Sequence, residues 1–537
     1  MYVVYHTDFP FYCNSMLFIK ILCSGQVVIM LGSKKRRASI GSLNNERELV
    51  IPMFVVSDIL EKIDMPEERN RVKAALAAIK SLGNARKKGE AAITAYLVGG
   101  AVRDLIIDQP IKDVDIEVHG LTLDELDETL KSFGHLNCVG KSFGVLRWEH
   151  SVVDWAVPRR DFAGRKPVVE INPAMNITDA LRRRDLTVNA MAIDLFSGEL
   201  IDPFGGLADL KNKIARSPDI RFFADDPLRF YRVMQFIGRF ELIPDDELNK
   251  TCAAMDIADV SHERIYGEFD KLFLKSHAPA RGIRWLDRIN RLADVLPELM
   301  PTVGLMQNPK WHPEGDVFEH TMQVLDAAAT LDYKTTEEKL TLLSAALCHD
   351  LGKPVATYVD NGRIRSTDHA EKGEPLVHSM IKRLTGSKKR IAAVCKLVKY
   401  HMEPGSFVEN NASAKAYRRL AVKLAPEASL HTLSLLSQAD KRGRNPDRNQ
   451  PLARLIDADT SVFIARAREL GVYEAPEAPV LTGQDLLDVI PEGTVLGTAV
   501  KRAYEIQIGE GITDKKILKK RVLAELGLYH EEGTKQQ

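Results

Sequence analysis

The sequence predicts an α+β fold, in which a small mixed sheet with helices forms an amino-terminal part and the rest of the chain is helical. Two observations carry this prediction. Segments with the composition or alternation of short strands occur between Tyr96 and Val157, whereas the chain after Gly206 is typical of helices. A length of 537 residues is too great for one core, so about three or four compact units are expected.

Charge is balanced over the chain, with 74 Lys and Arg residues against 74 Asp and Glu residues. No global field therefore attracts nucleic acid, and any RNA site must be a local basic patch. Each candidate patch is equally compatible with a solvated helix face. The candidates are Arg182–Arg184, Lys382–Arg390, Lys441–Arg444 and Lys515–Arg521.

Six cysteines occur without C-x-x-C spacing, which argues against a disulfide framework or a zinc ribbon and fits a reducing, cytoplasmic location. The apolar segment 16–31 is interrupted by polar residues, so neither a signal peptide nor a membrane partner is expected. Residues 1–55 form an amino-terminal extension, either disordered or an over-long start assignment. Helical apolar spacing follows over 57–92.

The segment from Tyr96 to Val118, YLVGGAVRDLIIDQPIKDVDIEV, is predicted to be a strand, a glycine turn, a helix and a second strand. Gly99 and Gly100 would let a phosphate approach bare backbone at a helix start, where free N–H groups favour an anion. Arg103 would add fixed positive charge there.

Residues 112–118 alternate acidic and apolar side chains, which predicts a strand with one acidic face. Asp113 and Asp115 then point the same way and can hold one or two divalent cations. Mg²⁺ prefers such oxygen ligands together with substrate phosphates, so phosphoryl or nucleotidyl transfer is indicated. A lone D-x-D is most often a solvated strand face, and a lone G-G is most often a turn. Their combination in one unit favours the functional interpretation.

The motifs LVGGAVRD and KDVDIEV together resemble the head of polymerase-beta-type nucleotidyltransferases, specifically the class II tRNA nucleotidyltransferase and bacterial poly(A) polymerase group. The resemblance extends over residues 91–520. It implies tRNA as a partner, CTP and ATP as donors and Mg²⁺ as the cofactor. Asp154, in the predicted strand 152–157, matches a position where the family carries a third acidic group, although a surface residue is an equal alternative.

The segment Arg182–Ala190, RRRDLTVNA, resembles the R-R-D-x-T-x-N-A signature of the same family. Arg184, next to Asp185, is the residue expected on the triphosphate, because a guanidinium matches phosphate oxygens bidentately. Residues 158–178 are predicted to be a loop. The family's longer, Gly-rich loop here bears on whether C, A or both are added, so this departure leaves the product open.

The segment Asp225–Arg232, DDPLRFYR, places Asp226, Arg229 and Arg232 along one helix face. An acceptor-only carboxylate and a donor-only guanidinium can pair with cytosine and adenine and reject uracil and guanine, whose edges present a carbonyl instead. The family motif usually begins with Glu where this chain has Asp225. The alternative is a helix salt bridge.

The carboxy-terminal half contains an ordered set of histidines and aspartates that resembles the H…HD…D pattern of HD phosphohydrolase domains. Imidazole and carboxylate ligands suit Ni²⁺, Mn²⁺ or Co²⁺, and a bound metal would activate water for phosphoester cleavage. Any single histidine here is more simply structural. The expected ligands are His320, His349, Asp350 and Asp440, with His369 and His401 as further candidates.

These patterns divide the chain into consecutive domains, ending in a helical region expected to contact tRNA. The expected function is CCA addition to tRNA, with CC- or A-adding enzymes and poly(A) polymerases as close alternatives. An HD phosphohydrolase with a non-catalytic RNA-binding head, or a non-catalytic RNA-binding protein, is the alternative of another class, and a homodimer is left open. The expected domains are an extension (1–55), a head (56–215), a neck and body (216–300), an HD domain (301–445) and a tail (446–537).

Overall fold

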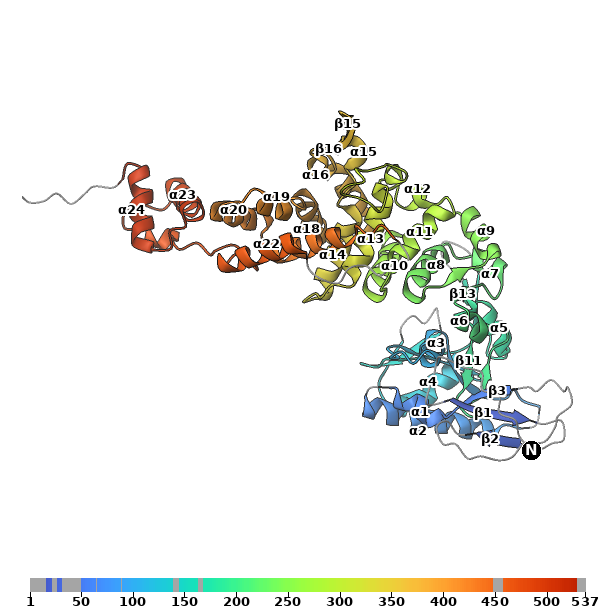
Figure 1. Cartoon of the computed structure of the whole chain (residues 1–537). Helices are drawn as coiled ribbons and strands as arrows, with labels where there is room; N and C mark the ends of the chain where they lie inside the picture. Colours follow the sequence, from blue (N-terminus) through green and yellow to red (C-terminus); the bar gives the residue numbers. More distant parts are fainter. Residues whose placement is uncertain are drawn as a thin grey trace, which may run out of the picture. The chain divides into compact units, whose positions relative to one another are not determined.

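A computed structural model describes residues 16–21, 27–30, 50–63, 65–87, 89–138, 144–162, 168–447 and 457–528. Two compact units are distinguished (Figure 1). The first takes in Met1–Val233 and Leu242–Asp259, and the second takes in Met234–Glu241 and Val260–Gln537. In the described residues, no helix combines the length and the hydropathy needed to cross a bilayer.

The first unit is built on a seven-stranded mixed sheet with the order β12-β11-β4-β5-β8-β7-β6. Only β5 and β8 pair in parallel, whereas the other neighbours are antiparallel. Buried and partly buried side chains alternate along β7 and β8, whereas β5 is buried from Ile116 to His119. The strands are β4 (Thr94–Val98), β5 (Val114–His119), β6 (Leu136–Cys138), β7 (Val145–Trp148), β8 (Val153–Ala156), β11 (Ala192–Asp194) and β12 (Leu200–Ile201).

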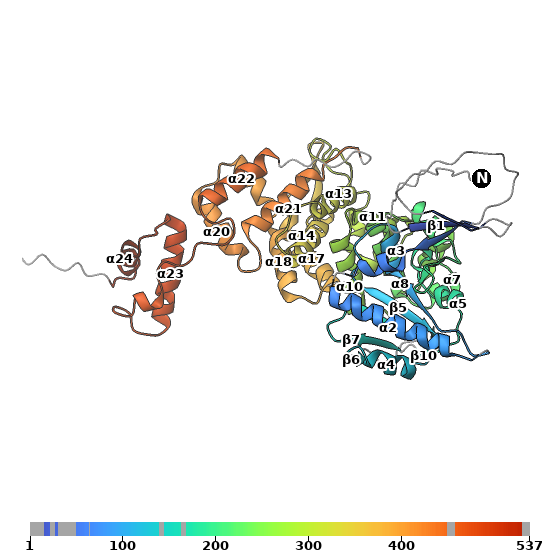
Figure 2. The ribbon, with the colours of Figure 1, turned by 90° about the horizontal axis from the view of Figure 1, so that it is seen from below.

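Helices cover this sheet and extend beyond it. The lead-in predicted over 57–92 is helical in α1 and α2 but not beyond Ala85. Helix α2, the long blue helix of Figure 2, packs against β4. Three short elements complete the unit: β13 (Ile214–Ala215), β14 (Ile243–Pro244) and the 3₁₀ turn Thr187–Asn189. The helices are α1 (Val56–Glu61), α2 (Pro66–Ala85), α3 (Gly100–Ile106), α4 (Leu123–Lys131), α5 (Ile177–Arg182), α6 (Gly206–Lys211), α7 (Ile220–Ala224), α8 (Leu228–Phe240) and α9 (Asp246–Ala254). Helix α8 is divided, because its residues from Met234 onward belong to the second unit.

The prediction of a loop over 158–178 is wrong. Strands β9 (Arg159–Phe162) and β10 (Val168–Ile171) pair as an antiparallel ribbon, and α5 begins at Ile177. The charged sequence RRDF does not alternate apolar and polar residues, so it gives no hydrophobic signal of a strand. The strand predicted from Lys112 also begins later, at Val114.

Strands β1 (Met16–Ile21), β2 (Val27–Met30) and β3 (Val50–Phe54) form a separate antiparallel sheet in the order β2-β1-β3. The rest of the segment expected to be an amino-terminal extension lies outside the described residues. The domain boundaries drawn from the sequence stay predictions.

The second unit is almost entirely helical, and the α+β prediction is confirmed. Helices α13, α14 and α21 pack against one another, while α23 and α24 share a small core of their own. One hairpin, β15 (Thr357–Asp360) and β16 (Arg363–Ser366), follows α15. The helices are α10 (His262–Lys275), α11 (Ala280–Arg288), α12 (Leu292–Val295), α13 (Val317–Ala329), α14 (Thr336–Cys348), α15 (Lys353–Ala356), α16 (His369–Lys372), α17 (Glu374–Leu384), α18 (Lys388–Lys399), α19 (Glu403–Glu409), α20 (Ala414–Leu424), α21 (Leu430–Arg442), α22 (Ala458–Glu469), α23 (Thr494–Glu510) and α24 (Lys515–Glu525).

Candidate functional site

The centre of the seven-stranded sheet aligns two of the predicted catalytic carboxylates. Asp115 on β5 stands opposite Val98, the last residue of β4, and also opposite Asp154 on the parallel strand β8. Because residues in register on neighbouring strands project to the same face, Asp115 and Asp154 form one acidic pair. The glycine turn follows directly after Val98, so it lies at the same edge.

At Gly99 the backbone of the turn lies against the side chains of Arg184 and Asp115. Its φ of +73° is in the left-handed region, where glycine is favoured. A Cβ placed there would lie 3.2 Å from Arg184 Nη1 and 3.5 Å from Asp115 Oδ2. The side chains predicted to bind triphosphate and metal therefore meet at bare backbone, beside Gly100 and the start of α3.

The carboxylates crowd one another. Burial raises the pKa of Asp115, Arg184 opposes this effect, and Asp154 and Asp113 add to it. Asp113 is exposed and lies just before β5. A divalent cation would relieve this repulsion between hard oxygen donors, so the residues fit Mg²⁺.

Arg147 is a site neighbour that the sequence did not indicate. It stands opposite Asp154 across β7 and β8, and its Nε and Nη2 donate to the two carboxylate oxygens at 2.5 and 2.6 Å. A surface strand arginine has no local sequence signal of such a role, because its partner is set by the register.

Two partly buried arginines of the R-R-D segment converge on a second residue that the sequence did not assign, Glu117. Arg183 Nη2 donates to Glu117 at 3.3 Å, and Arg184 Nη2 lies 3.9 Å from the same oxygen. Burial opposes ionisation of Glu117, but His119 and the two arginines lower its pKa to about 2. An ionised Glu117 thus holds two guanidinium groups in place. Its position in the acidic alternation was the available signal.

Arg103 occupies a more enclosed position than its predicted role suggests. Its buried guanidinium donates to Asp104 and to the Asn189 side-chain oxygen, and Asn189 Nδ2 donates to Asp185 at 2.9 Å. Arg103 therefore links the glycine turn to the R-R-D segment, and its contact with phosphate stays a prediction.

Helix α8 is attached to the R-R-D segment through two arginines. Arg232 Nε donates to Asp185 at 2.6 Å, and Arg229 Nη2 donates to the Arg183 carbonyl at 2.7 Å. Although burial alone would raise it, the pKa of Asp185 falls to about 2 because Arg232 and Asn189 stabilise the carboxylate. The two motifs that the sequence singled out separately are thus in contact.

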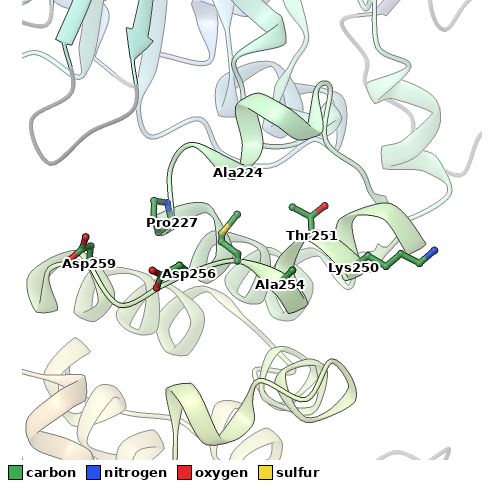
Figure 3. A pocket seen from close by; sticks show the side chains of 8 residues that line it. Ala224, Pro227, Lys250, Thr251, Ala254, Asp256 and Asp259 are labelled. Carbon is green, nitrogen blue, oxygen red and sulfur yellow. The ribbon is translucent and has the colours of Figure 1, made fainter.

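Asp226 caps the start of α8 by accepting from the Leu228 N–H at 3.1 Å, and Arg229 also donates to the Phe222 carbonyl. Pockets lined by described residues lie beside both motifs. The first lies at the acidic pair and is lined by Val98, Asp115, Ile116, Glu117, Val145, Asp154, Ala156, Val157, Arg159, Arg183 and Arg184. The second, beside Pro227, is lined by Ala224, Pro227, Lys250, Thr251, Ala254, Met255, Asp256 and Asp259 (Figure 3).

The second unit gathers the ordered histidines and aspartates around one carboxylate, that of Asp350. One of its oxygens lies 3.2 Å from His349 Nε2 and 3.7 Å from His320 Nε2. The other lies 3.2 Å from His369 Nε2 and 3.9 Å from His401 Nε2. Asp440 completes the set at 3.1 Å from His320 Nε2. All six side chains are buried.

Three of these imidazoles are oriented in the same way. In each, Nδ1 contacts the backbone carbonyl three residues earlier, at 2.8 Å for His349, 2.8 Å for His369 and 2.6 Å for His401. A carbonyl only accepts, so Nδ1 carries a proton, and in the neutral ring Nε2 presents its lone pair toward Asp350. This is the outer-shell arrangement of metal-ligating histidines, and the donor set fits one or two transition-metal ions sharing Asp350.

Two cations that the sequence did not assign balance the aspartates. Lys353 Nζ lies 2.6 Å from Asp350, and Arg444 Nη2 donates to both oxygens of Asp440 at 3.1 Å. Burial disfavours the charged carboxylate, but His349 and Lys353 hold the pKa of Asp350 well below its usual value. The i, i+3 spacing from Asp350 to Lys353 was a usable signal.

The basic helix α24 is largely neutralised within its own part of the chain. Lys515 Nζ pairs with Asp485 at 2.8 Å, Lys519 pairs with Asp488 at 2.6 Å, and Arg521 lies 3.4 Å from Glu510. These pairs reduce the local positive charge available to RNA, and a contact with tRNA here stays a prediction.

Both candidate metal sites lie in regions of the chain that match known protein families. Residues 95–216 match the poly A polymerase head domain, and residues 317–445 match the HD domain. The chain is 32% identical to the multifunctional CCA protein of Pasteurella multocida over 364 residues, which are 65% of this chain and 84% of that protein.

Solved structures share the fold. The Thermotoga maritima CCA-adding enzyme complexed with tRNA aligns with a TM-score of 0.53 and 18% identity, covering 88% of this chain and 98% of that one. The Bacillus stearothermophilus CCA-adding enzyme in complex with CTP aligns with a TM-score of 0.56 and 17% identity, covering 86% and 98%. At such identities the likeness extends to the fold alone.

Proposed function

Because this chain belongs to the multifunctional CCA protein family, we propose that it is a tRNA nucleotidyltransferase that adds and repairs the 3′-terminal CCA of tRNA, with CTP and ATP as donors. The observation that supports this proposal most directly is that Asp115 and Asp154 lie in register, beside the Gly99 turn and Arg184. Tyr96–Val118 thus supplies backbone for phosphate and carboxylates for metal within one unit.

In this proposal Asp113, Asp115 and Asp154 would hold Mg²⁺, and a bound ion would supply Lewis-acid chemistry to the attacking tRNA 3′ hydroxyl and to the leaving pyrophosphate. The protein itself forms no covalent intermediate. Gly99, Gly100 and the N–H groups at the start of α3 cradle the triphosphate. Arg184, held by Glu117, presents fixed positive charge to the same phosphates.

Base selection is assigned to Asp226 and Arg229. The contact of Arg229 with the Arg183 carbonyl supports this role, because it fixes the guanidinium one residue away from the triphosphate-binding Arg184. Arg232 supports the same region through Asp185. A C or A edge would pair with the Asp226 carboxylate and the Arg229 guanidinium, while U or G would leave buried polar groups unpaired.

A second function is favoured by the histidine cluster. We infer that His320, His349, Asp350 and Asp440, with His369 and His401 beside them, bind a transition metal and hydrolyse phosphoesters, such as 2′,3′-cyclic phosphates or nucleoside monophosphates. The supporting observation is the shared orientation of Nε2 atoms toward Asp350. A metal bound there would supply hydroxide near neutral pH.

The alternatives differ in product. CC-adding, A-adding and poly(A)-adding enzymes would use the same carboxylates, and an HD phosphohydrolase with an inactive head would not need them. The partner tRNA, the identity of the metals, a cytoplasmic location and a homodimer belong to the proposal.

The deciding experiment incubates the full-length protein with Mg²⁺ and tRNA lacking its 3′ end, offering CTP and ATP singly and together. We expect two C residues with CTP alone and a complete CCA end only with both nucleotides. Extension by C alone under all conditions, by A alone, or by long A tails would replace CCA addition with the corresponding alternative. No extension at all would leave the HD activity as the main function.

A further inference from the structure

The segment Leu305–Asp316 precedes α13 as a loop closed at its base. The Val317 N–H donates to the Leu305 carbonyl at 3.0 Å, and Met306 forms an isolated bridge with Asp316. Asp316 also caps α13 by accepting from the Glu319 N–H at 2.7 Å. These contacts hold the loop, which contains His312 and Glu314, against the first turn of the helix that carries His320.

Glu314 in this loop contacts two imidazoles. Its Oε1 lies 2.7 Å from His320 Nδ1 and 2.9 Å from His312 Nδ1. The two rings meet edge to face, with centroids 4.6 Å apart. The Glu314 side chain has no exposed surface, and its Oε2 is buried without a hydrogen-bond partner among the described residues. Burying a carboxylate in this way is costly, so it calls for a reason beyond packing.

One explanation is that His312, Glu314 and His320 bind a metal of their own, since their donor atoms lie close enough. The geometry of His320 argues against it. Its Nε2 already faces Asp440 at 3.1 Å and Asp350 at 3.7 Å. A neutral imidazole has one proton and one lone pair, so a ligating Nε2 leaves the proton on Nδ1. Nδ1 then donates to Glu314 and has no lone pair for a second metal.

His320 also differs from the other three imidazoles. Their Nδ1 atoms contact backbone carbonyls, whereas His320 Nδ1 is 2.7 Å from a carboxylate and 3.2 Å from the Gly443 carbonyl. A charged acceptor makes the stronger hydrogen bond and increases the basicity of the opposite nitrogen. His320 would therefore be the strongest imidazole ligand of the set.

We propose that Glu314, braced by His312, is a positioning residue that fixes the ring and tautomer of His320 and thereby sets the metal affinity of the HD site. This inference rests on the proposed metal-dependent function of that site. His312 keeps Glu314 in place through the 2.9 Å contact of its Nδ1. Neither residue touches substrate or metal.

The test compares the purified full-length protein with its Glu314→Gln variant. Gln keeps the shape of Glu but loses the charge that holds the Nδ1 proton. We expect the dissociation constant for Ni²⁺ or Mn²⁺, measured by calorimetry, to rise by about 10- to 100-fold. His312→Gln should give a smaller rise. CCA addition should stay unchanged.

Glu338→Gln is the matched control, because Glu338 Oε1 makes a similar contact with His431 Nε2 at 3.2 Å, outside the Asp350 cluster. It should leave metal affinity unchanged. An unaltered affinity in Glu314→Gln would overturn the proposal. So would a second bound metal in the parent protein that both Glu314→Gln and His312→Gln remove, since that outcome makes the group a ligand set.

A metal-free measurement separates this proposal from the function on which it rests. Crystal structures of the metal-free parent and Glu314→Gln proteins should differ in the His320 ring, which turns away from Asp440 when Glu314 is neutralised. If the parent binds no metal, the proposed HD function fails, and the ring orientation still decides the positioning role. In that case an unmoved ring rejects it. Should Glu314→Gln not fold, His312→Gln serves for both measurements.

Discussion

The two candidate metal centres solve the same problem in opposite ways. In the helical unit, each ligand side chain is buried and already oriented by hydrogen bonds from its far nitrogen or by a neighbouring cation. In the sheet unit, Asp115 and Asp154 stand side by side and are only partly buried, with their repulsion offset by Arg147 and Arg184. The helical centre is preorganised for its ion, whereas the sheet centre depends on incoming cations and phosphates to complete it.

The largest effect should come from Asp115→Asn, which keeps size and hydrogen bonding but removes charge from a partly buried carboxylate at the centre of the sheet. Loss of a metal ligand removes several kcal/mol of transition-state stabilisation, so CCA addition should fall by about 1000-fold. Single-turnover extension of truncated tRNA measures it, and filter binding should show tRNA affinity retained. Asp124→Asn, an exposed acid on α4, is the control. Full activity in both Asp113→Asn and Asp115→Asn would contradict the site assignment.

The independence of the centres is tested by replacing His349 and Asp350 together with Ala. Two ligands of the preorganised site are lost, so phosphohydrolysis stimulated by Ni²⁺, Mn²⁺ or Co²⁺ should become undetectable while CCA addition persists. Hydrolysis of a 2′,3′-cyclic phosphate substrate and extension of tRNA are measured on the same preparation. His378→Ala, at an exposed histidine of α17, is the control. Loss of CCA addition in the double variant would mean that the two units are coupled.

The sequence predicted candidate ligands of both centres but not the partners that orient them. The G-G turn, the D-x-D strand and the H…HD…D order are local patterns, and each marked residues that the fold brings together. The partners that orient them were not local. Arg147 faces Asp154 only through strand register, and Glu117 holds Arg183 across 66 positions of sequence. No periodicity encodes such pairs, because they depend on how separate elements pack.

The ribbon β9–β10 was missed for a related reason. Pattern analysis detects a strand by the face that it buries, and Arg159–Phe162 is charged rather than alternating. Lys353 and Glu314, by contrast, lie within three and six positions of predicted ligands. Asking what neutralises Asp350 and what orients His320 would have found both from the sequence.

A smaller effect concerns base choice in the sheet unit. Arg229→Ala removes half of the proposed base-pairing set, so preference for CTP and ATP over UTP and GTP should fall by roughly 10- to 100-fold, the cost of one unsatisfied buried polar group. Misincorporation of each nucleotide on tRNA is the measurement. Lys250→Ala, which alters the neighbouring pocket of Figure 3, is the control. Unchanged selectivity with reduced rate would make Arg229 only a support for the Arg183 carbonyl.

The smallest expected effect concerns the Mg²⁺ requirement of the sheet centre, where Arg147 occupies Asp154. Arg147 places its guanidinium on both oxygens of Asp154, where a divalent cation would otherwise bind. In Arg147→Met this competing charge is gone, so the Mg²⁺ concentration that half-saturates CCA addition should fall by about 3- to 10-fold. Arg147→Lys retains the charge and should resemble the parent protein. A higher Mg²⁺ requirement in Arg147→Met would mean instead that Arg147 moves to the triphosphate when substrate binds. Both centres would then rely on a protein cation during the reaction, and the contrast between them would lie in burial alone.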